Sequence, residues 1–240
     1  MKHLLVCLAS FLALGTLHAQ EPADYVNPFI GTTNFGTCNP GAVCPNGMMS
    51  VVPFNVMGSE DNKYDKDARW WSTPYDYTNS FFTGFAHVNL SGVGCPELGS
   101  LLLMPTTGKL DVDYRNYGSK YEKENATPGY YTISLTKYNI LAEATATPRT
   151  GLSRFTFPKG ESNILLNLGE GLTNETGAFM RRVSDCEVEG MKVLGTFCYN
   201  PQAVFPIYFV MRINKAPKAT GYWKKQRPIQ GVEALWDKDQ

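Results

Sequence analysis

The middle of the chain alternates hydrophobic and polar residues with a period of two. Four runs show this pattern: YYTISLT from Tyr130, ILAEATATP from Ile140, GLSRFTFP from Gly151 and NILLNL from Asn163. The segments KYN, PRTG and PKGES, which are rich in turn-forming residues, separate them. Because a period of two places alternate side chains on opposite faces, each run predicts a half-buried β-strand.

Shorter hydrophobic runs predict further strands on both sides of this region. No segment between the strands has a helical period, so the sequence predicts an all-β fold, an antiparallel β-sandwich. The last run, Gly231–Trp236, resembles part of an element cut short, and we therefore expect a fragment of a longer protein. The additional predicted strands are Met48–Phe54, Phe81–Leu90, Leu101–Met104, Cys186–Val193, Thr196–Tyr199 and Val204–Ile213.

The first residues have the pattern of a secretory signal. Lys2 precedes an apolar run, Leu4–Leu14, and Leu17-His18-Ala19 follows as a cleavage site. The run is shorter than the roughly 20 residues that a membrane-spanning helix needs, and no second run of that length follows. Residues 1–19 are therefore predicted to be a signal peptide, residues 20–240 one exported domain without a membrane span, and the protein secreted or periplasmic.

Composition narrows the possible partners. The 22 basic and 22 acidic residues cancel, so no clustered positive charge favours nucleic acid as a partner. A content of 43% hydrophobic and 12% aromatic residues, with only 18% charged, excludes a disordered chain. The 22 glycines and 15 prolines suit many short strands joined by tight turns.

Five cysteines follow the predicted signal, and an odd number leaves at least one outside any internal disulfide. Cys186 and Cys198 are 12 residues apart in strand-like sequence, a spacing compatible with a bridge between neighbouring strands. Cys38 and Cys44 flank a Pro-Gly turn and either form a bridge or stay reduced, and Cys95 is the fifth cysteine. No Cys-x-x-Cys pair or Cys/His cluster is present, so no zinc site is expected.

The loop Asn27–Met48 is one candidate for binding. Its glycines, Gly31 and Gly36 among them, allow close approach of the backbone, and Phe35 supplies an aromatic ring. The loop lacks the Lys-Ser/Thr pair of a phosphate-binding loop, which excludes nucleotide binding there. It either presents backbone groups and Phe35 to a ligand or is a turn-rich connection at the edge of the sandwich.

Two further segments carry residues suited to sugar recognition. Arg69, Trp70 and Trp71 combine indole faces, on which the CH groups of a sugar ring stack, with a guanidinium that reaches hydroxyl oxygens. Core packing is the alternative for each tryptophan. His87 and Asn89 alternate on one strand face, which makes either a polar ligand-facing surface or a structural histidine with its neighbour. Neither a serine-nucleophile motif nor a pair of catalytic carboxylates is recognisable.

Three blocks in order, NPFIGT…PGA…PNGM, GFAHVNLSGVGC…LLLMPTTG and TPGYYTISLTKYNILAEATATPRTGLSRFTFP, resemble the N-terminal domain of glycoside hydrolase family 92. The resemblance covers about Tyr25–Leu168. It implies a mutarotase-like supersandwich that packs on a C-terminal (α/α)₆ barrel in a secreted, calcium-dependent exo-α-mannosidase. In that family the barrel supplies the inverting acid and base and the calcium ligands, so this chain is expected to hold neither catalytic nor metal-binding residues, both of which would lie beyond Gln240.

The resemblance also implies a role in binding for named residues. Phe35 and Gly36 match the loop that approaches a terminal mannose, and Arg69 with Trp70 or Trp71 matches further contacts. Two motifs depart from the family pattern. Positions 86–89 read AHVN where the family has SHTH, and positions 45–48 read PNGM where it often has PFGM.

These observations give a leading hypothesis and two alternatives. In the leading one the chain forms part of the substrate pocket of an α-mannosidase, with mannose-containing glycans and the barrel domain as partners, and is inactive alone. The first alternative is a free-standing secreted carbohydrate-binding sandwich. The second is a purely structural domain whose former contact with the barrel is now an oligomer interface, which requires only an exposed apolar surface.

Overall fold

A computed structural model describes residues 21–33, 36–56, 73–92, 97–172, 174–195, 200 and 202–237. The chain is almost entirely β-structure, and every strand pairing in this part is antiparallel, as predicted. The elements are η1 (Pro22–Tyr25), β1 (Ala42–Val43), β2 (Ser50–Phe54), β3 (Phe81–Phe82), β4 (Gly84–Asn89), β5 (Leu98–Thr107), α2 (Tyr114–Tyr117), β6 (Ser119–Thr127), β7 (Tyr130–Leu135), β8 (Ile140–Ala146), β9 (Gly151–Thr156), β10 (Ser162–Asn167), β11 (Asn174–Ser184), β12 (Glu187–Gly195), β13 (Phe205–Arg212), β14 (Tyr222–Lys224), β15 (Arg227–Ile229) and β16 (Ala234–Asp237).

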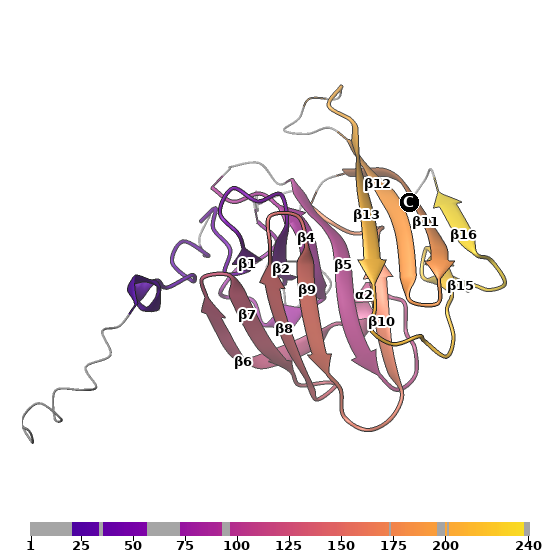
Figure 1. Cartoon of the computed structure of the whole chain (residues 1–240), viewed down its shortest axis with the longest axis horizontal. Helices are drawn as coiled ribbons and strands as arrows, with labels where there is room; N and C mark the ends of the chain where they lie inside the picture. The colour runs from indigo at the N-terminus through magenta and orange to yellow at the C-terminus, as the bar shows by residue number, and fades with distance from the viewer. Residues whose placement is uncertain are drawn as a thin grey trace, which may run out of the picture.

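The strands form three larger sheets and one small hairpin. A central sheet has the order β1-β2-β4-β5-β10 and faces a second sheet, β3-β6-β7-β8-β9. A third sheet, β13-β12-β11-β16, lies beside the central sheet on the other side, and β14 and β15 form a separate hairpin (Figure 1).

The main hydrophobic core lies between the first two sheets. Phe85 of β4 is fully buried at its centre. Its ring centroid lies 5.0 Å from that of Phe82, 6.0 Å from that of Tyr131 and 6.3 Å from that of Phe155. Strands from both sheets therefore meet on one aromatic side chain, which makes that side chain central to the stability of the sandwich.

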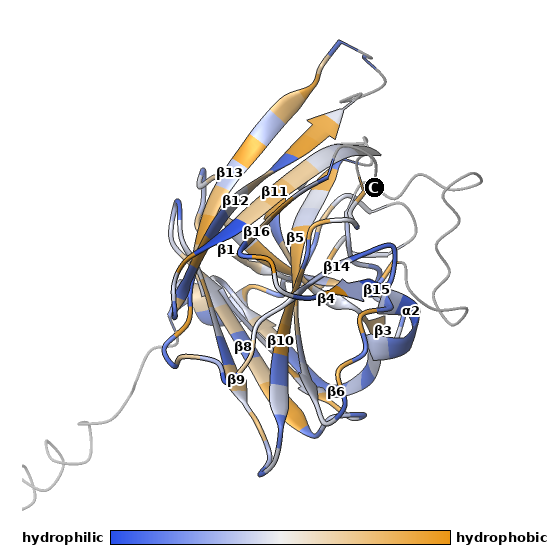
Figure 2. Cartoon of the chain, turned by 90° about the vertical axis from the view of Figure 1, so that its right-hand side faces the viewer, coloured by the Kyte–Doolittle hydropathy of each residue, from blue (hydrophilic) through white to orange (hydrophobic). Residues whose placement is uncertain are grey.

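The central sheet is also covered on its opposite face. Phe54, Leu102 and Leu172 form one buried cluster there, while Val88 and Leu98 pack with residues of β12 and β13 in another. All five residues of β2 are buried, as are all but the last of β5. Hydrophobic segments of the third sheet run alongside this middle layer in Figure 2. The fold is thus a sandwich extended to a third layer.

The period-two runs correspond closely to strands β7–β10, and the run predicted at Val204–Ile213 is β13. Two long strands, β6 and β11, were not predicted. The predicted strand at Thr196–Tyr199 and the predicted signal peptide lie outside the described residues. Among the described helices, none has the length and apolar character to cross a membrane.

The cysteines of the described part are not bridged. Cys38, Cys44 and Cys186 are free thiols, so the Cys38–Cys44 pair takes the reduced alternative. Cys186 lies in the turn between β11 and β12. Cys95 and Cys198 lie outside the described residues.

Candidate functional site

Hydrogen bonds and a ring contact link three separate stretches of sequence beside the central sheet. They are the loop before β1, the segment 73–80 before β3 and the turn that follows β4. The backbone N–H of Tyr77 donates to the carbonyl of Thr32 (2.9 Å), and the N–H of Gly92 donates to the carbonyl of Thr37 (2.7 Å). The rings of Phe29 and Tyr77 add an edge-to-face contact with centroids 5.6 Å apart. The loop that carries Gly36, the segment 73–80 and the turn after Asn89 therefore lie together, and we call this region the loop junction.

Close backbone packing shapes the first of these stretches. The N–H of Gly36 donates to the carbonyl of Thr33 (2.9 Å), and that of Cys38 donates to the carbonyl of Gly31 (3.2 Å). A Cβ atom at position 36 would lie 1.9 Å from the carbonyl oxygen of Gly31, far inside contact distance. Only glycine fits at position 36, so the loop conformation requires the residue that the sequence pattern singled out. Phe35 lies outside the described residues.

A buried asparagine anchors the second stretch. Asn55 follows β2 directly and is fully buried. Its amide Nδ2 donates to the carbonyl of Asp76 (3.0 Å), and its Oδ1 accepts from the N–H of Asp76 (2.8 Å). Nδ2 also lies 2.9 Å from the hydroxyl of Tyr121 in the second sheet, and Asn79 donates back to the carbonyl of Asn55 (2.9 Å). This side chain fixes the segment that follows residues 57–72.

Neither Asn55 nor Asp76 was predicted from the sequence as a site residue. The signal was a polar residue at the end of an apolar strand, where a side chain can bond backbone groups of a passing segment. Arg69, Trp70 and Trp71 belong to the stretch that Asn55 and Asp76 flank, and all three lie outside the described residues. Their role in binding stays a prediction.

His87 lies on β4, half-buried beside β9. Its Nδ1 is 2.8 Å from the carbonyl oxygen of Leu101, and since a carbonyl only accepts, Nδ1 carries a proton and donates it. A Cβ atom added at Gly151 would come within 3.1 Å of its ring. Burial lowers the pKa of His87 from 6.5, although hydrogen bonds to the Leu101 and Phe85 backbone oppose that shift. His87 is therefore neutral at neutral pH.

Asn89 is held by its neighbour across the sheet. Its Nδ2 donates to the hydroxyl of Ser50 (3.0 Å) and to the carbonyl of Ala86 (3.1 Å). Its Oδ1 is buried and accepts no hydrogen bond from any residue that the structure describes. The Nδ1 of His87 and the Nδ2 of Asn89 thus hold β4 in place, and β4 leads into the loop junction.

Titration of His87 gives a testable pH dependence. The unfolded chain binds a proton at His87 as the pH falls through 6.5, whereas the folded chain resists it, so the free energy of unfolding falls over that range. His87→Asn keeps a donor for the Leu101 carbonyl but does not titrate, and we expect it to reduce this loss. Urea denaturation at a series of pH values measures the difference. His87 is the one histidine after the predicted signal, so an identical pH dependence in parent and variant would contradict the assignment.

The described residues offer no evident metal centre. No group of three His, Cys, Asp or Glu side chains among them is placed to hold an ion. Glu97 is buried just before β5.

Comparisons with known proteins find relatives of the whole domain. The model of the glycosyl hydrolase family 92 N-terminal domain matches residues 25–239. A family GH92 α-mannosidase of Bacteroides thetaiotaomicron, solved in complex with mannoimidazole, superposes with a TM-score of 0.80 at 27% identity over 92% of this chain and 30% of that chain. An inverting GH92 mannosidase of the same organism superposes with a TM-score of 0.68 at 20% identity over 92% of this chain and 29% of its own, and shows the shared fold alone.

A curated relative extends the comparison to a fungus. A protein of Arthroderma benhamiae described as an uncharacterized secreted glycosidase is 33% identical over 64% of this chain and 21% of its own length. The chain therefore spans about a third or less of the relatives that it matches.

Proposed function

Because the chain belongs to glycosyl hydrolase family 92, as its N-terminal domain, we propose that it forms one side of the mannose pocket of an exo-acting, inverting α-mannosidase. The observation that carries the proposal is the loop junction. It joins the loop containing Gly36 to the turn after Asn89 through the hydrogen bond between Gly92 and Thr37. In this proposal Phe35, Arg69 and one of the two adjacent tryptophans complete the contacts to the sugar.

Catalysis is proposed to need groups from outside this chain. In the longer family members the acid and base would come from the barrel that follows, at the separation that leaves room for a water molecule between the two carboxyl groups. Support comes from length, since the chain corresponds to 30% of the Bacteroides α-mannosidase. We therefore propose that the 240-residue chain alone does not hydrolyse mannosides.

Calcium belongs to the same proposal. Calcium takes six to eight oxygen ligands, largely carboxylates and carbonyls. The described part of this chain holds no cluster of His, Cys, Asp or Glu residues that fits such an ion. We propose that the barrel binds it and that the ion helps to distort the mannose ring.

Export is proposed from the N-terminal pattern. The arrangement of Lys2, an apolar run and Leu17-His18-Ala19 suits a signal peptide, and the fungal relative is described as secreted. The proposal leaves secreted and periplasmic locations equally open.

Hydrolysis of a nitrophenyl α-mannoside tests the proposal. The chain alone should show no turnover, while a chimera in which it replaces the matching domain of the Bacteroides α-mannosidase should be active with calcium and inactive with a chelator. Gly36→Ala in the chimera should reduce kcat/KM about 100-fold, because a displaced loop misplaces the sugar. Gly221→Ala, whose Cβ would only touch the Ile229 carbonyl at 3.7 Å, is the matched control.

The outcomes separate the hypotheses. Turnover by the chain alone would contradict the proposal that it does not hydrolyse mannosides. A folded chimera in which Gly36→Ala behaves like Gly221→Ala would remove the pocket-forming role and leave the alternative, a carbohydrate-binding sandwich without catalysis.

A further inference from the structure

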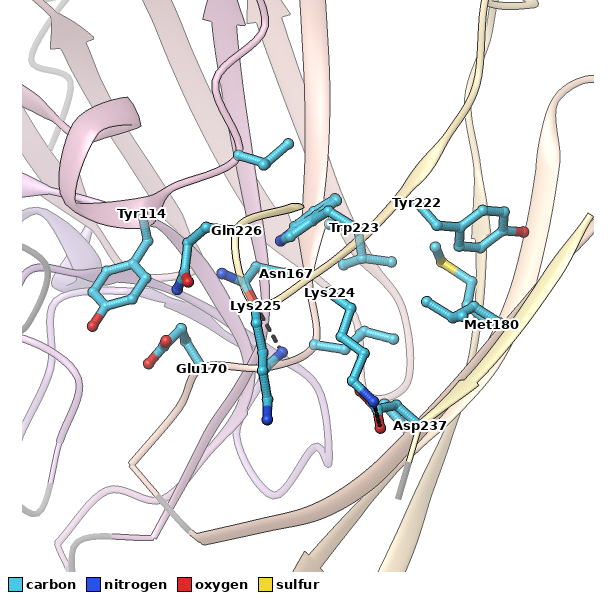
Figure 3. A pocket seen from close by; sticks show the side chains of 16 residues that line it. Tyr114, Asn167, Glu170, Met180, Tyr222, Trp223, Lys224, Lys225, Gln226 and Asp237 are labelled. Atoms are coloured by element: carbon cyan, nitrogen blue, oxygen red, sulfur yellow. Dashed lines mark hydrogen bonds and ion pairs between the residues drawn. The ribbon is translucent and has the colours of Figure 1, made fainter. Parts of the chain in front are cut away.

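A second candidate binding site lies at the opposite flank of the central sheet from β1. A cavity of about 170 Å³ opens between the loop after β10, the β14–β15 hairpin and the inner face of β11 and β16 (Figure 3). None of its lining residues belongs to the loop junction. Ligand pockets usually have volumes of about 300–1,000 Å³, so this cavity suits one ring of a larger ligand rather than a whole one.

The walls of the cavity combine aromatic faces with uncharged and charged polar groups. Trp223 forms one wall, and Figure 3 shows the amide of Gln226 close to the phenol of Tyr114 and the carboxylate of Glu170 on the other side. Met180 adds an apolar surface at the far end. An indole face opposite several hydrogen-bonding groups matches a pyranose ring, which has apolar CH faces and a rim of hydroxyl groups.

Charge in the cavity argues for an uncharged ligand. The Nζ of Lys224 lies 2.7 Å from the carboxylate of Asp237, so these two charges compensate each other. The Glu170 carboxylate and the Lys225 ammonium bring one charge of each sign to the remaining wall. Among the side chains that line the cavity, the charges of the two signs therefore balance, which suits an uncharged ligand.

The floor of the cavity is fixed before any ligand binds. Asn167 donates from Nδ2 to the hydroxyl of Tyr117 (2.9 Å) and accepts at Oδ1 from the N–H of Gly169 (2.8 Å). The Nζ of Lys192, a fully buried side chain, donates to the carbonyl of Glu170 (2.6 Å). The loop 168–170 is thereby held in place, which reduces the conformational cost of binding.

The hairpin turn over the cavity has a backbone conformation that its two central residues disfavour. Lys224 pairs with Arg227, which leaves Lys225 and Gln226 as a two-residue turn with φ of 49° and 59°. Positive φ at both positions is the geometry that Asn-Gly adopts with little strain, whereas long side chains adopt it at a cost. Strain of this kind concentrates at functional sites, and here it places two long polar side chains in the cavity wall.

We propose that this cavity binds one uncharged pyranose unit of a glycan, stacked on Trp223 and hydrogen-bonded by Gln226 and Glu170. The ligand class rests on the cavity's own chemistry, and the site would bind sugar whether or not the loop junction does.

Fluorotryptophan NMR can test both sites separately. The chain has four tryptophans, Trp70, Trp71, Trp223 and Trp236, so each labelled resonance can be assigned by single substitution to phenylalanine. We expect the Trp223 resonance to shift saturably during titration with methyl α-mannoside. Trp236, half-exposed and adjacent in sequence to cavity residues but absent from the lining, is the internal control and should not move.

Two variants test which groups bind the sugar. Glu170→Gln removes the charged acceptor, and we expect the affinity measured at Trp223 to fall about tenfold. The double change Lys225→Asn with Gln226→Gly gives the turn its preferred residues, so we expect a higher melting temperature together with an affinity about fivefold lower. Because this variant should be more stable, loss of binding in it cannot be attributed to unfolding.

The results distinguish the proposals. A Trp223 resonance that does not move with methyl α-mannoside, glucoside or galactoside overturns the cavity proposal, and so does an affinity unchanged in both variants. If Trp70 or Trp71 responds while Trp223 does not, the loop junction keeps its proposed function and only the cavity proposal fails.

Discussion

Replacing Asn55 with alanine should lower the free energy of unfolding by about 3 kcal/mol or more, because buried polar groups that lose their partners cost about 1–3 kcal/mol each. The substitution removes the acceptor for the Asp76 N–H, the donor to the Asp76 carbonyl and the amide group that contacts the Tyr121 hydroxyl. The two hydrogen bonds to Asp76 are buried, so water cannot easily replace the lost partner there.

Urea denaturation of parent and variant measures the effect as a shift of the midpoint at unchanged slope. Asn163→Ala is the matched control, since Asn163 also bonds a hydroxyl and a carbonyl but at the partly exposed edge of the sheet. We expect that control to cost less than about 1 kcal/mol. Asn55→Asp keeps an acceptor for the Asp76 N–H but loses the donor, so its urea midpoint should also lie below that of the parent. Equal midpoints for Asn55→Ala and Asn163→Ala would refute the anchoring role.

The second large effect is expected at Phe85. Phe85→Ala should destabilise the fold by about 3–5 kcal/mol, the usual cost of removing a buried aromatic ring and leaving a cavity. The ring contacts Phe82, Tyr131 and Phe155, so its loss affects both sheets of the main sandwich. Against a total stability of about 5–15 kcal/mol for a typical domain, such a loss leaves the chain marginally folded.

Leu152→Ala on β9 provides the comparison for Phe85→Ala. Leu152 is 64% exposed, so its truncation should change stability by less than about 0.5 kcal/mol. Thermal and urea unfolding of the two variants should therefore differ strongly. If Phe85→Ala unfolds at the same urea concentration as Leu152→Ala, the core is not organised around this ring.

Strands were predicted well from the sequence where one face is buried and the other is more exposed to solvent. β7 shows why, because its residues alternate between half-buried and buried positions along the whole strand. β6 was not predicted because its buried and exposed residues do not alternate along the whole strand. A register shift between Glu122 and Asn125 turns Glu124 inward, where it accepts from the hydroxyl of Tyr131 (2.5 Å). Burial raises the pKa of Glu124, and a carboxylate at an inward position conceals the hydrophobic period.

The candidate site was predictable only as separate segments. Gly36 was identified from its residue type, but its clash with the Gly31 carbonyl depends on the folded loop. The role of Asn55 depends on Asp76, which lies 21 residues away in the sequence and close in space only after folding. Propensity and spacing report on local geometry, whereas hydrogen bonds between distant segments follow from the tertiary structure.

The doubly covered central sheet has a consequence for the order of folding. Strand β5 gains its second neighbour, β10, only after four further strands of another sheet have been made, and its outer face is covered by side chains as distant as Leu194 and Phe205. Pairing between segments so far apart in the sequence is intrinsically slow. The middle layer cannot be completed until the C-terminal part of the chain has emerged from the ribosome. Until then, the outer face of this middle layer stays uncovered in the nascent chain.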